Sequence, residues 1–203
     1  MPTTRESFLE KYKEPLKSVA SLALMLLIIY TAFFSIEVAL ANPSPFYVVD
    51  SGSMEPMIKP GDLVIARGVG EKTISYLFIP ISIKGVDPAD LKEGDIIIFW
   101  APEPYINHPE YQKPIIHRII AIKYENGKRY FKTKGDANPD PDPPGDPRTW
   151  WVPEDNVIAK YETHVRELGA ILYTIKRPEG ITAILLVIIA IIAVDALKNV
   201  RKK

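Results

Sequence analysis

Two serines in one short turn are the residues best suited to chemistry. Ser51 and Ser53 flank a glycine in the stretch SGSMEP, residues 51–56, which follows an apolar run and precedes Gly61-Asp62. Such a turn can hold one hydroxyl at an exposed point, where it could act as a nucleophile. A serine is inert by itself, so a base and an oxyanion donor must come from elsewhere. The alternative is a β-turn that merely carries serines.

Three histidines could supply the base. His108 lies in a proline-rich loop, and His164 lies in the stretch that leads to a second apolar segment. His117 lies inside the apolar run IIHRII, residues 115–120, where strand alternation puts it on one face with Ile115 and Ile119. A neutral imidazole is the usual base for a serine, although a lone histidine in a strand is often a packed structural residue.

A carboxylate that orients the imidazole could come from the proline-stiffened loop at residues 134–146. Its candidates are Asp136, Asp140 and Asp142. A calcium loop is an alternative, because Asp136, Asn138 and Asp140 fall at ligand spacing. Pro141 stands where that loop needs a glycine and Pro147 where it needs a bidentate glutamate, so we reject it. One aspartate could hold the imidazole in the right tautomer, and the sequence leaves open which one.

A long apolar segment follows the polar residues 1–17. Residues 18–40 are almost continuously apolar, with Glu37 as the interruption. About 20 such residues are what a helix needs to cross a bilayer. We predict a retained transmembrane helix, with a cleavable signal peptide as the alternative because Ala39-Leu40-Ala41 has the small-x-small pattern of a cleavage site.

A second apolar segment lies at residues 179–197 and precedes the basic tail, residues 198–203. We predict a second transmembrane helix, because a buried core helix, the alternative, is seldom apolar on every face. Basic residues outside both segments predict that both termini are cytoplasmic and that residues 41–178 form an extracytoplasmic domain.

The pattern between the apolar segments is that of β-strands. Gly-Asp pairs at residues 61–62 and 94–95 each lead into an apolar strand, 63–66 and 96–100. Further strands are predicted at residues 74–83, 115–124, 129–133 and 157–161, with a hairpin turn at Asn126-Gly127 and no helix of useful length. The predicted fold is mostly β: an antiparallel domain, as a partly closed barrel or two packed sheets, with N-terminal and C-terminal transmembrane helices.

Composition limits the classes of function. The 203 residues have room for one domain and membrane segments, and 25 Lys and Arg against 25 Asp and Glu give no overall attraction to nucleic acid. The absence of cysteine excludes a thiol nucleophile, a disulfide framework and a cysteine-ligated metal.

The motifs together resemble a type I signal peptidase of the archaeal and endoplasmic-reticulum kind. Four stretches carry the likeness and occur in the family's order over residues 46–142. They are SGSMEP with Gly61-Asp62, GDIIIF at residues 94–99, HRI at residues 117–119 and KGDAN at residues 134–138.

The resemblance implies a role for each matching residue. Ser53 is then the nucleophile, Ser51 an oxyanion donor, and His117 the general base where the bacterial branch has a lysine. Asp142 and Asp136 match two aspartates of the family. The implied function is a membrane-bound serine endopeptidase that removes N-terminal signal peptides from exported preproteins, with no metal or other cofactor. The expected partners are signal peptides, the lipid bilayer of the cell membrane and the protein translocation machinery, and no nucleic acid.

Two other functions stay open. One is a non-catalytic, membrane-anchored β module that binds extracytoplasmic partners, and the other is a membrane serine protease of different specificity. Residues 68–93 form a longer linker between the two Gly-Asp strands than the family minimum, and no role follows for them from the sequence.

Overall fold

The computed structural model describes residues 4–103, 105–143 and 150–176, with the isolated positions 182, 186 and 190. The strands are β1 (Phe46–Val48), β2 (Leu63–Gly68), β3 (Glu71–Tyr76), β4 (Ile79–Lys84), β5 (Ile96–Phe99), β6 (Ile115–Glu125), β7 (Lys128–Lys134), β8 (Val152–Pro153) and β9 (Val157–Val165). The helices are α1 (Thr4–Ala39) and α2 (Leu168–Lys176), with short 3-10 helices at Pro88–Asp90, Tyr105–Asn107, Pro109–Tyr111 and Glu154–Asn156.

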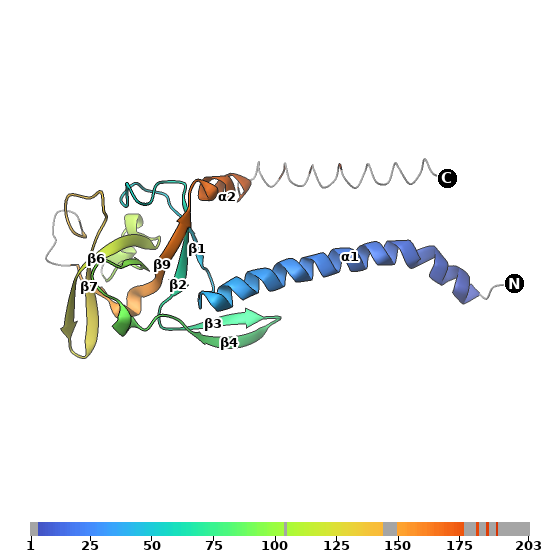
Figure 1. The fold of residues 1–203 in the computed structure, drawn as a ribbon, viewed down its shortest axis with the longest axis horizontal. Coiled ribbons are helices and arrows are strands. Elements are labelled where there is room, and N and C mark those ends of the chain that lie inside the picture. Colours follow the sequence, from blue (N-terminus) through green and yellow to red (C-terminus); the bar gives the residue numbers. More distant parts are fainter. Residues whose placement is uncertain are drawn as a thin grey trace.

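A curled antiparallel sheet forms the body of the protein, and α1 projects away from it (Figure 1). Its seven strands run in the order β1-β2-β9-β5-β6-β7-β8, while β3 and β4 form a separate pair. The mostly β class, with an antiparallel half-barrel behind an N-terminal apolar helix, is therefore confirmed. The second predicted transmembrane segment, residues 179–197, lies almost wholly outside the described residues.

Helix α1 is long and apolar enough to cross a membrane at Val19–Ala39, where its side chains are exposed. Its end is fastened to the sheet. The Arg67 guanidinium donates to the Ala39 carbonyl (2.9 Å), and the buried Asn42 amide donates to the Ala66 carbonyl (2.9 Å). A basic side chain on the last carbonyls is a favourable helix cap, so α1 ends at a fixed point beside β2.

The strands after the two Gly-Asp pairs form as predicted, as β2 and β5. Strand β5 is buried along its whole length because a hydrophobic cluster covers each of its faces. Ile97 and Phe99 belong to one cluster, and Ile96 and Ile98 to the other. The hairpin of β6 and β7 also forms, with both turn residues, Asn126-Gly127, at positive φ.

The prediction of one strand at residues 74–83 is wrong. The chain reverses at Leu77 and Phe78, so that Tyr76 pairs with Ile79 and the segment becomes the β3–β4 hairpin. Both turn residues have positive φ, 47° and 71°. Glycine or asparagine usually marks such a turn, and neither is present here, so the apolar pattern read as a continuous strand.

The expectation of no helix between the apolar segments is also wrong. Helix α2 follows β9 and packs against β1 and β2. The Ala170 N–H donates to the Gly61 carbonyl (2.9 Å), which ties the first turn of α2 to the loop before β2. Helix α2 has only nine residues, which is too short for a helical period to stand out in the sequence.

Candidate active site

Ser53 lies on the loop between β1 and β2. Two buried side chains, Met54 and Ile58, anchor this loop in the core, and the Ile58 N–H donates to the Met54 carbonyl (3.0 Å). The Ala137 N–H donates to the Ser53 carbonyl (2.9 Å), which joins the serine to the loop after β7. The Ser53 side chain is therefore held at a defined, partly buried position.

His117 lies on β6, opposite Ile97 of β5, and is 7% exposed. Its ring meets the Phe99 ring edge-on at a centroid distance of 6.5 Å. The Nε2 atom of His117 is 3.0 Å from the Ser53 Oγ. The predicted strand thus carries the histidine to the serine across 64 residues of sequence.

Asp142 is the aspartate that contacts the imidazole. Its Oδ2 lies 2.6 Å from the His117 Nδ1 and also accepts a hydrogen bond from the Thr133 hydroxyl (2.8 Å). The side chain of Asp142 is 7% exposed. Its backbone is fixed as well, because the Asp142 N–H donates to the Thr133 carbonyl and the buried Lys132 ammonium donates to the Asp142 carbonyl (2.7 Å).

These contacts define the direction of proton transfer. A carboxylate can only accept, so the hydrogen between Asp142 and the imidazole belongs to Nδ1. The Nε2 atom then presents its lone pair to the Ser53 hydroxyl, which can donate its proton there. A serine, a histidine and an aspartate in one hydrogen-bonded row can perform nucleophilic acyl transfer.

The other two candidate residues lie beside this row. The Ser51 Oγ is 3.3 Å from the Ser53 Oγ. Asp136 pairs with Arg118 through two hydrogen bonds of 2.8 and 2.6 Å, and that pairing raises the pKa of the guanidinium. In the described part of the chain, Asp136 has no hydrogen bond to His117, and the Asp140 side chain is exposed.

The remaining histidines have other surroundings. The His108 ring lies against Tyr111 in the exposed loop after β5, with a centroid distance of 5.7 Å. His164 accepts or donates a hydrogen bond with the Tyr161 hydroxyl (2.7 Å) near Asp62. Sequence reasoning missed Lys132 and Thr133, which hold the aspartate, because nothing in the pattern of β7 distinguishes them from other polar strand residues.

Gly135 lies where any side chain would collide with the serine loop. A Cβ at this position would lie 2.6 Å from the Ser53 carbonyl oxygen and 2.8 Å from the Asn138 Nδ2. We expect Gly135→Ala to lower kcat by about 100-fold, because a displacement of about 1 Å in a reacting group costs that much. Steady-state kinetics on a peptide substrate will measure this.

The matched control for Gly135→Ala is Gly127→Ala in the β6–β7 turn. That variant has open space for its Cβ but strains a backbone with φ of 78°, so it should lower the melting temperature and leave kcat unchanged. Equal losses of kcat in the two variants would mean that the effect comes from stability alone.

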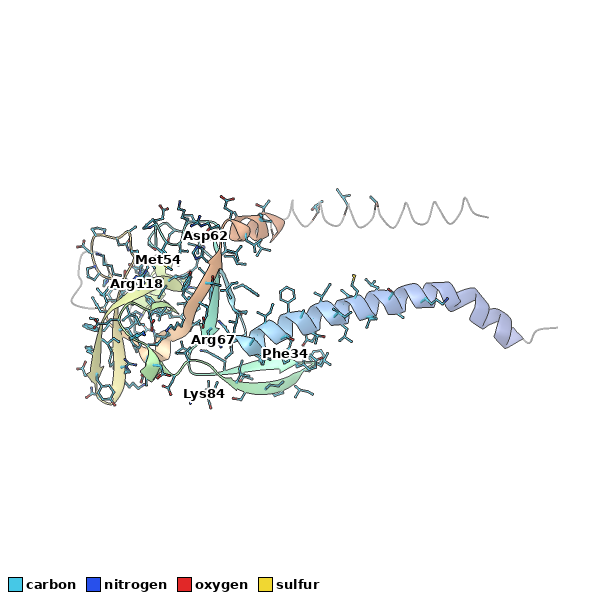
Figure 2. The ribbon with its side chains drawn as sticks, in the orientation of Figure 1. Phe34, Met54, Asp62, Arg67, Lys84 and Arg118 are labelled. Atoms are coloured by element: carbon cyan, nitrogen blue, oxygen red, sulfur yellow. The ribbon has the colours of Figure 1, made fainter. Side chains whose placement is uncertain are left out.

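Asp62 joins α2 to the loop that precedes β2 (Figure 2). Its buried carboxylate accepts from the Lys59 N–H (2.9 Å) and from the Glu167 N–H (3.1 Å). Burial acts to raise the pKa of Asp62. These hydrogen bonds and the electrostatic effects of His164 and Arg166 outweigh burial, so the pKa lies below its ordinary value of 3.8.

This lowered pKa predicts a dependence of stability on pH. Because the folded pKa lies below the unfolded one, the charged carboxylate stabilises the fold above pH 3.8, and the contribution is lost as the pH falls through the folded pKa. We expect Asp62→Asn to lower the free energy of unfolding by about 1–3 kcal/mol at pH 7 and by progressively less at acid pH.

Melting temperatures in detergent over a pH series will measure the effect at Asp62. The control is Asp50→Asn, which breaks an exposed ion pair with Lys113 and should cost under about 1 kcal/mol. A loss at Asp62→Asn that is independent of pH would contradict the assigned cause.

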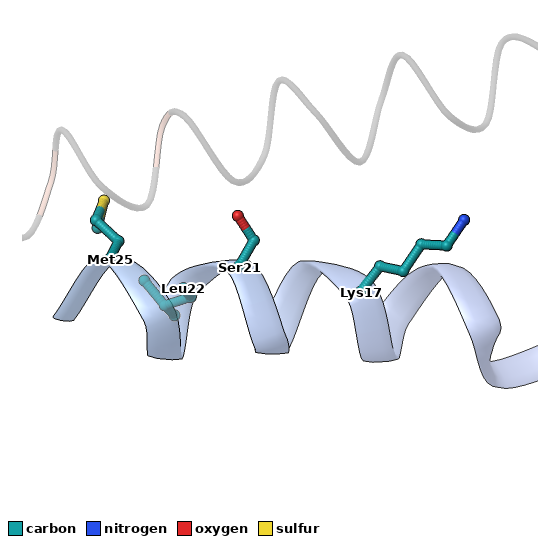
Figure 3. A pocket seen from close by; sticks show the side chains of 4 residues that line it. All are labelled: Lys17, Ser21, Leu22 and Met25. Atoms are coloured by element: carbon teal, nitrogen blue, oxygen red, sulfur yellow. The ribbon is translucent and has the colours of Figure 1, made fainter. Parts of the chain in front are cut away.

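An open hollow runs along α1 and is lined by Lys17, Ser21, Leu22 and Met25 (Figure 3). It shares no residue with the row formed by Ser53, His117 and Asp142. We assign no chemistry to it.

A serine, a histidine and an aspartate in one row are the side chains that serine hydrolases use, here on a β domain behind an apolar helix. Residues 17–128 match the family model described as signal peptidase, peptidase S26. The match covers more than half of the chain, which therefore belongs to the signal peptidase family.

Curated relatives agree with this family. The chain is 30% identical over 135 residues to the signal peptidase complex catalytic subunit of Metarhizium robertsii, covering 64% of each chain. It is 25% identical over 127 residues to the corresponding subunit of Schizosaccharomyces pombe, covering 63% of this chain and 64% of the relative. The chain thus spans slightly less than two thirds of the length of these relatives.

Proposed function

We propose that this protein is a membrane-bound serine endopeptidase that removes N-terminal signal peptides from exported preproteins. The observation that carries the proposal is the hydrogen-bonded row from the Ser53 hydroxyl through His117 to the Asp142 carboxylate, with distances of 3.0 and 2.6 Å. Membership of the signal peptidase family and the names of the relatives support the choice of substrate.

Ser53 is the nucleophile and His117 the general base in this proposal. Nε2 takes the hydroxyl proton as Oγ attacks the scissile carbonyl. The imidazolium then donates this proton to the leaving amine, and the acyl group stays on Oγ. Water activated by the same nitrogen then releases the acyl group. Asp142 orients the imidazole and stabilises its protonated form, as its contact with Nδ1 allows.

Ser51 is the proposed oxyanion donor, together with the backbone N–H of Ser53. Its hydroxyl lies 3.3 Å from the nucleophilic oxygen, close enough to reach an oxyanion that forms next to it. Asp136 acts through Arg118, whose guanidinium also donates to the Gly94 carbonyl and the Met57 sulfur. We assign Asp136 a positioning role, because it holds the Arg118 guanidinium, which connects β6 to the serine loop through Met57.

The substrate segment after the signal helix is proposed to bind as an added strand between β1 and the start of β6. The Val49 N–H and C=O form hydrogen bonds with the loop before β2. Because backbone groups alternate in direction along a strand, the N–H and C=O groups of Val48 and Asp50 point away from that loop, toward the added strand. Strand β7 pairs with β6 only from Arg118 onward, which leaves that edge of residues 115–117 to a partner. An extended peptide can add to such edges by main-chain hydrogen bonds.

The proposed setting is the cell membrane, with α1 as a retained anchor. In this proposal both termini are cytoplasmic, residues 179–197 form a second span and the β domain is extracytoplasmic. The basic residues outside the two apolar segments support this orientation. Signal helices in the same bilayer would then meet the enzyme in a local search, delivered by the translocation machinery.

The test is cleavage of several secretory precursors by the full chain in liposomes, with the cut site located by mass spectrometry. The proposal predicts a single cut after a small-x-small site, abolished when the residue before the cut is replaced by a bulky one. Cuts at unrelated sequences would indicate a serine protease of other specificity. No cut in any precursor would favour a binding module.

A further inference from the structure

The β3–β4 hairpin stands apart from the main sheet and lies along the end of α1 (Figure 1). Residues 68–70 and 85–86 form a narrow neck that closes its base. There the Gly70 N–H donates to the Val86 carbonyl (2.8 Å). A Cβ on Gly85 would lie 2.0 Å from the Gly68 carbonyl oxygen, so only glycine permits this approach. The Gly68 N–H donates to the Leu40 carbonyl (2.9 Å), which fixes the neck to the end of α1.

The far end of the hairpin is held by aromatic side chains of α1. The Tyr76 ring lies 4.4 Å from the Phe34 ring and 5.7 Å from the Tyr30 ring, between centroids. Figure 2 shows Phe34 where α1 runs beside the hairpin. The Tyr30 hydroxyl donates to the Ser75 carbonyl (3.3 Å) and accepts from the Leu77 N–H (3.1 Å).

These contacts set the hairpin tip at the level of the apolar segment. Tyr30 and Phe34 both lie within Val19–Ala39, the stretch long enough to cross a membrane. About 10 Å of helix separates Tyr30 from Glu37, the charged residue near the end of that stretch, at about 1.5 Å per residue. A hairpin bonded to Tyr30 must therefore reach past the level of Glu37.

Polarity changes along the hairpin in the same direction. Its charged residues are at the base, where Glu71 pairs in register with Lys84 and Lys72 follows. Figure 2 labels Lys84. No charged residue occurs from 73 to 83. At the tip Leu77 and Ile79 are exposed, and Phe78 is 99% exposed. Such a gradient suits an element that passes from water into lipid.

The β6–β7 and β3–β4 turns have similar backbone conformations but carry different residues. The β6–β7 turn has Asn126 and Gly127 at φ of 51° and 78°. The β3–β4 turn has Leu77 and Phe78 at φ of 47° and 71°. Positive φ is unfavourable for bulky residues, so the second turn accepts strain to carry apolar side chains. In lipid this exchange is reasonable, and the Tyr30 hydroxyl satisfies a backbone N–H that water could not reach.

We infer that the hairpin tip, residues 76–79, is inserted among the lipid chains of the leaflet on the side of the β domain. The inference rests on the proposed role of α1 as a membrane anchor. The hairpin adds an insertion beside α1, which restrains tilting of the β domain about that helix. Because the neck follows directly on β2, the hairpin helps to set the height and orientation of the Ser53 loop over the bilayer.

The experiment uses the full chain, which has no cysteine, with one spin label at a time in phosphatidylcholine vesicles at low protein density. Phe78→Cys places the label at the tip. Phe33→Cys places it on α1, where Phe33 is 55% exposed, and Tyr124→Cys places it near the end of β6, where Tyr124 is 73% exposed. Collision with oxygen, which concentrates in lipid, is compared with collision with a water-soluble nickel chelate.

We expect the labels at 78 and 33 to collide several-fold more with oxygen than with the chelate, and the label at 124 to show the reverse. If the label at 78 behaves like that at 124 while the label at 33 is in lipid, the hairpin inference is overturned and the anchor stands. Protection of the label at 78 from both reagents would also overturn it, because protein would then cover the tip. Chelate contact at 33 would overturn the anchor and the inference together.

Discussion

His117→Gln is expected to lower kcat for precursor cleavage by about four to six orders of magnitude, as removal of the general base does in a Ser–His–Asp site. Glutamine keeps a polar side chain of similar reach at this buried position but cannot take the Ser53 proton. The large effect follows from the 3.0 Å contact between Nε2 and the hydroxyl. Single-turnover cleavage of a fluorogenic peptide will measure it.

The control for His117→Gln is His108→Gln in the exposed loop after β5. His108 lies against Tyr111 and outside the proposed site, so its replacement should leave kcat unchanged. Melting curves of both variants will show whether the fold survives. Residual activity of His117→Gln above one tenth of the wild type would contradict its role as the base.

Asp142→Asn is expected to lower kcat by about 10⁴-fold with little change in KM. If the new amide nitrogen faces the imidazole, it donates to Nδ1, and the proton moves to Nε2, where it blocks acceptance from Ser53. If the amide oxygen faces the imidazole, the negative charge that stabilises the imidazolium is still lost. Steady-state kinetics, with kcat and KM determined separately, will measure the change.

The matched control is Asp136→Asn, another aspartate of the same loop. It weakens the ion pair with Arg118 and leaves the contact of Asp142 with His117 in place. We expect a loss of about tenfold or less, of the kind that a small misplacement causes. A loss at Asp136 as large as that at Asp142 would reverse the roles assigned to the two carboxylates.

The main strands could be predicted because each carries its own local signal. A Gly-Asp pair precedes β2 and β5, and Asn126-Gly127 marks the β6–β7 turn. The β3–β4 hairpin could not be predicted, because Leu77 and Phe78 give no turn signal in an aqueous setting. The inferred insertion of this turn into lipid explains why the usual turn residues are absent.

The serine and the histidine of the candidate site could be proposed from the sequence, but the choice among the aspartates could not. Asp136 and Asp142 both lie in the loop after β7, and they differ in the direction in which their side chains point. Thr133 and Lys132 donate hydrogen bonds to Asp142 and hold it in contact with His117, whereas Asp136 forms an ion pair with Arg118. These contacts depend on the pairing of β6 with β7, which residue spacing does not specify.

The most direct test of the central claim is to trap the acyl group on the nucleophile. A signal-peptide segment with an ester at the scissile bond is mixed with the enzyme and quenched with acid, and the digested protein is mapped by mass spectrometry. We predict an added acyl mass on the peptide containing Ser53, absent in Ser53→Ala and still formed, more slowly, in Ser51→Ala. An adduct on another residue, or undiminished cleavage by Ser53→Ala, would contradict the account.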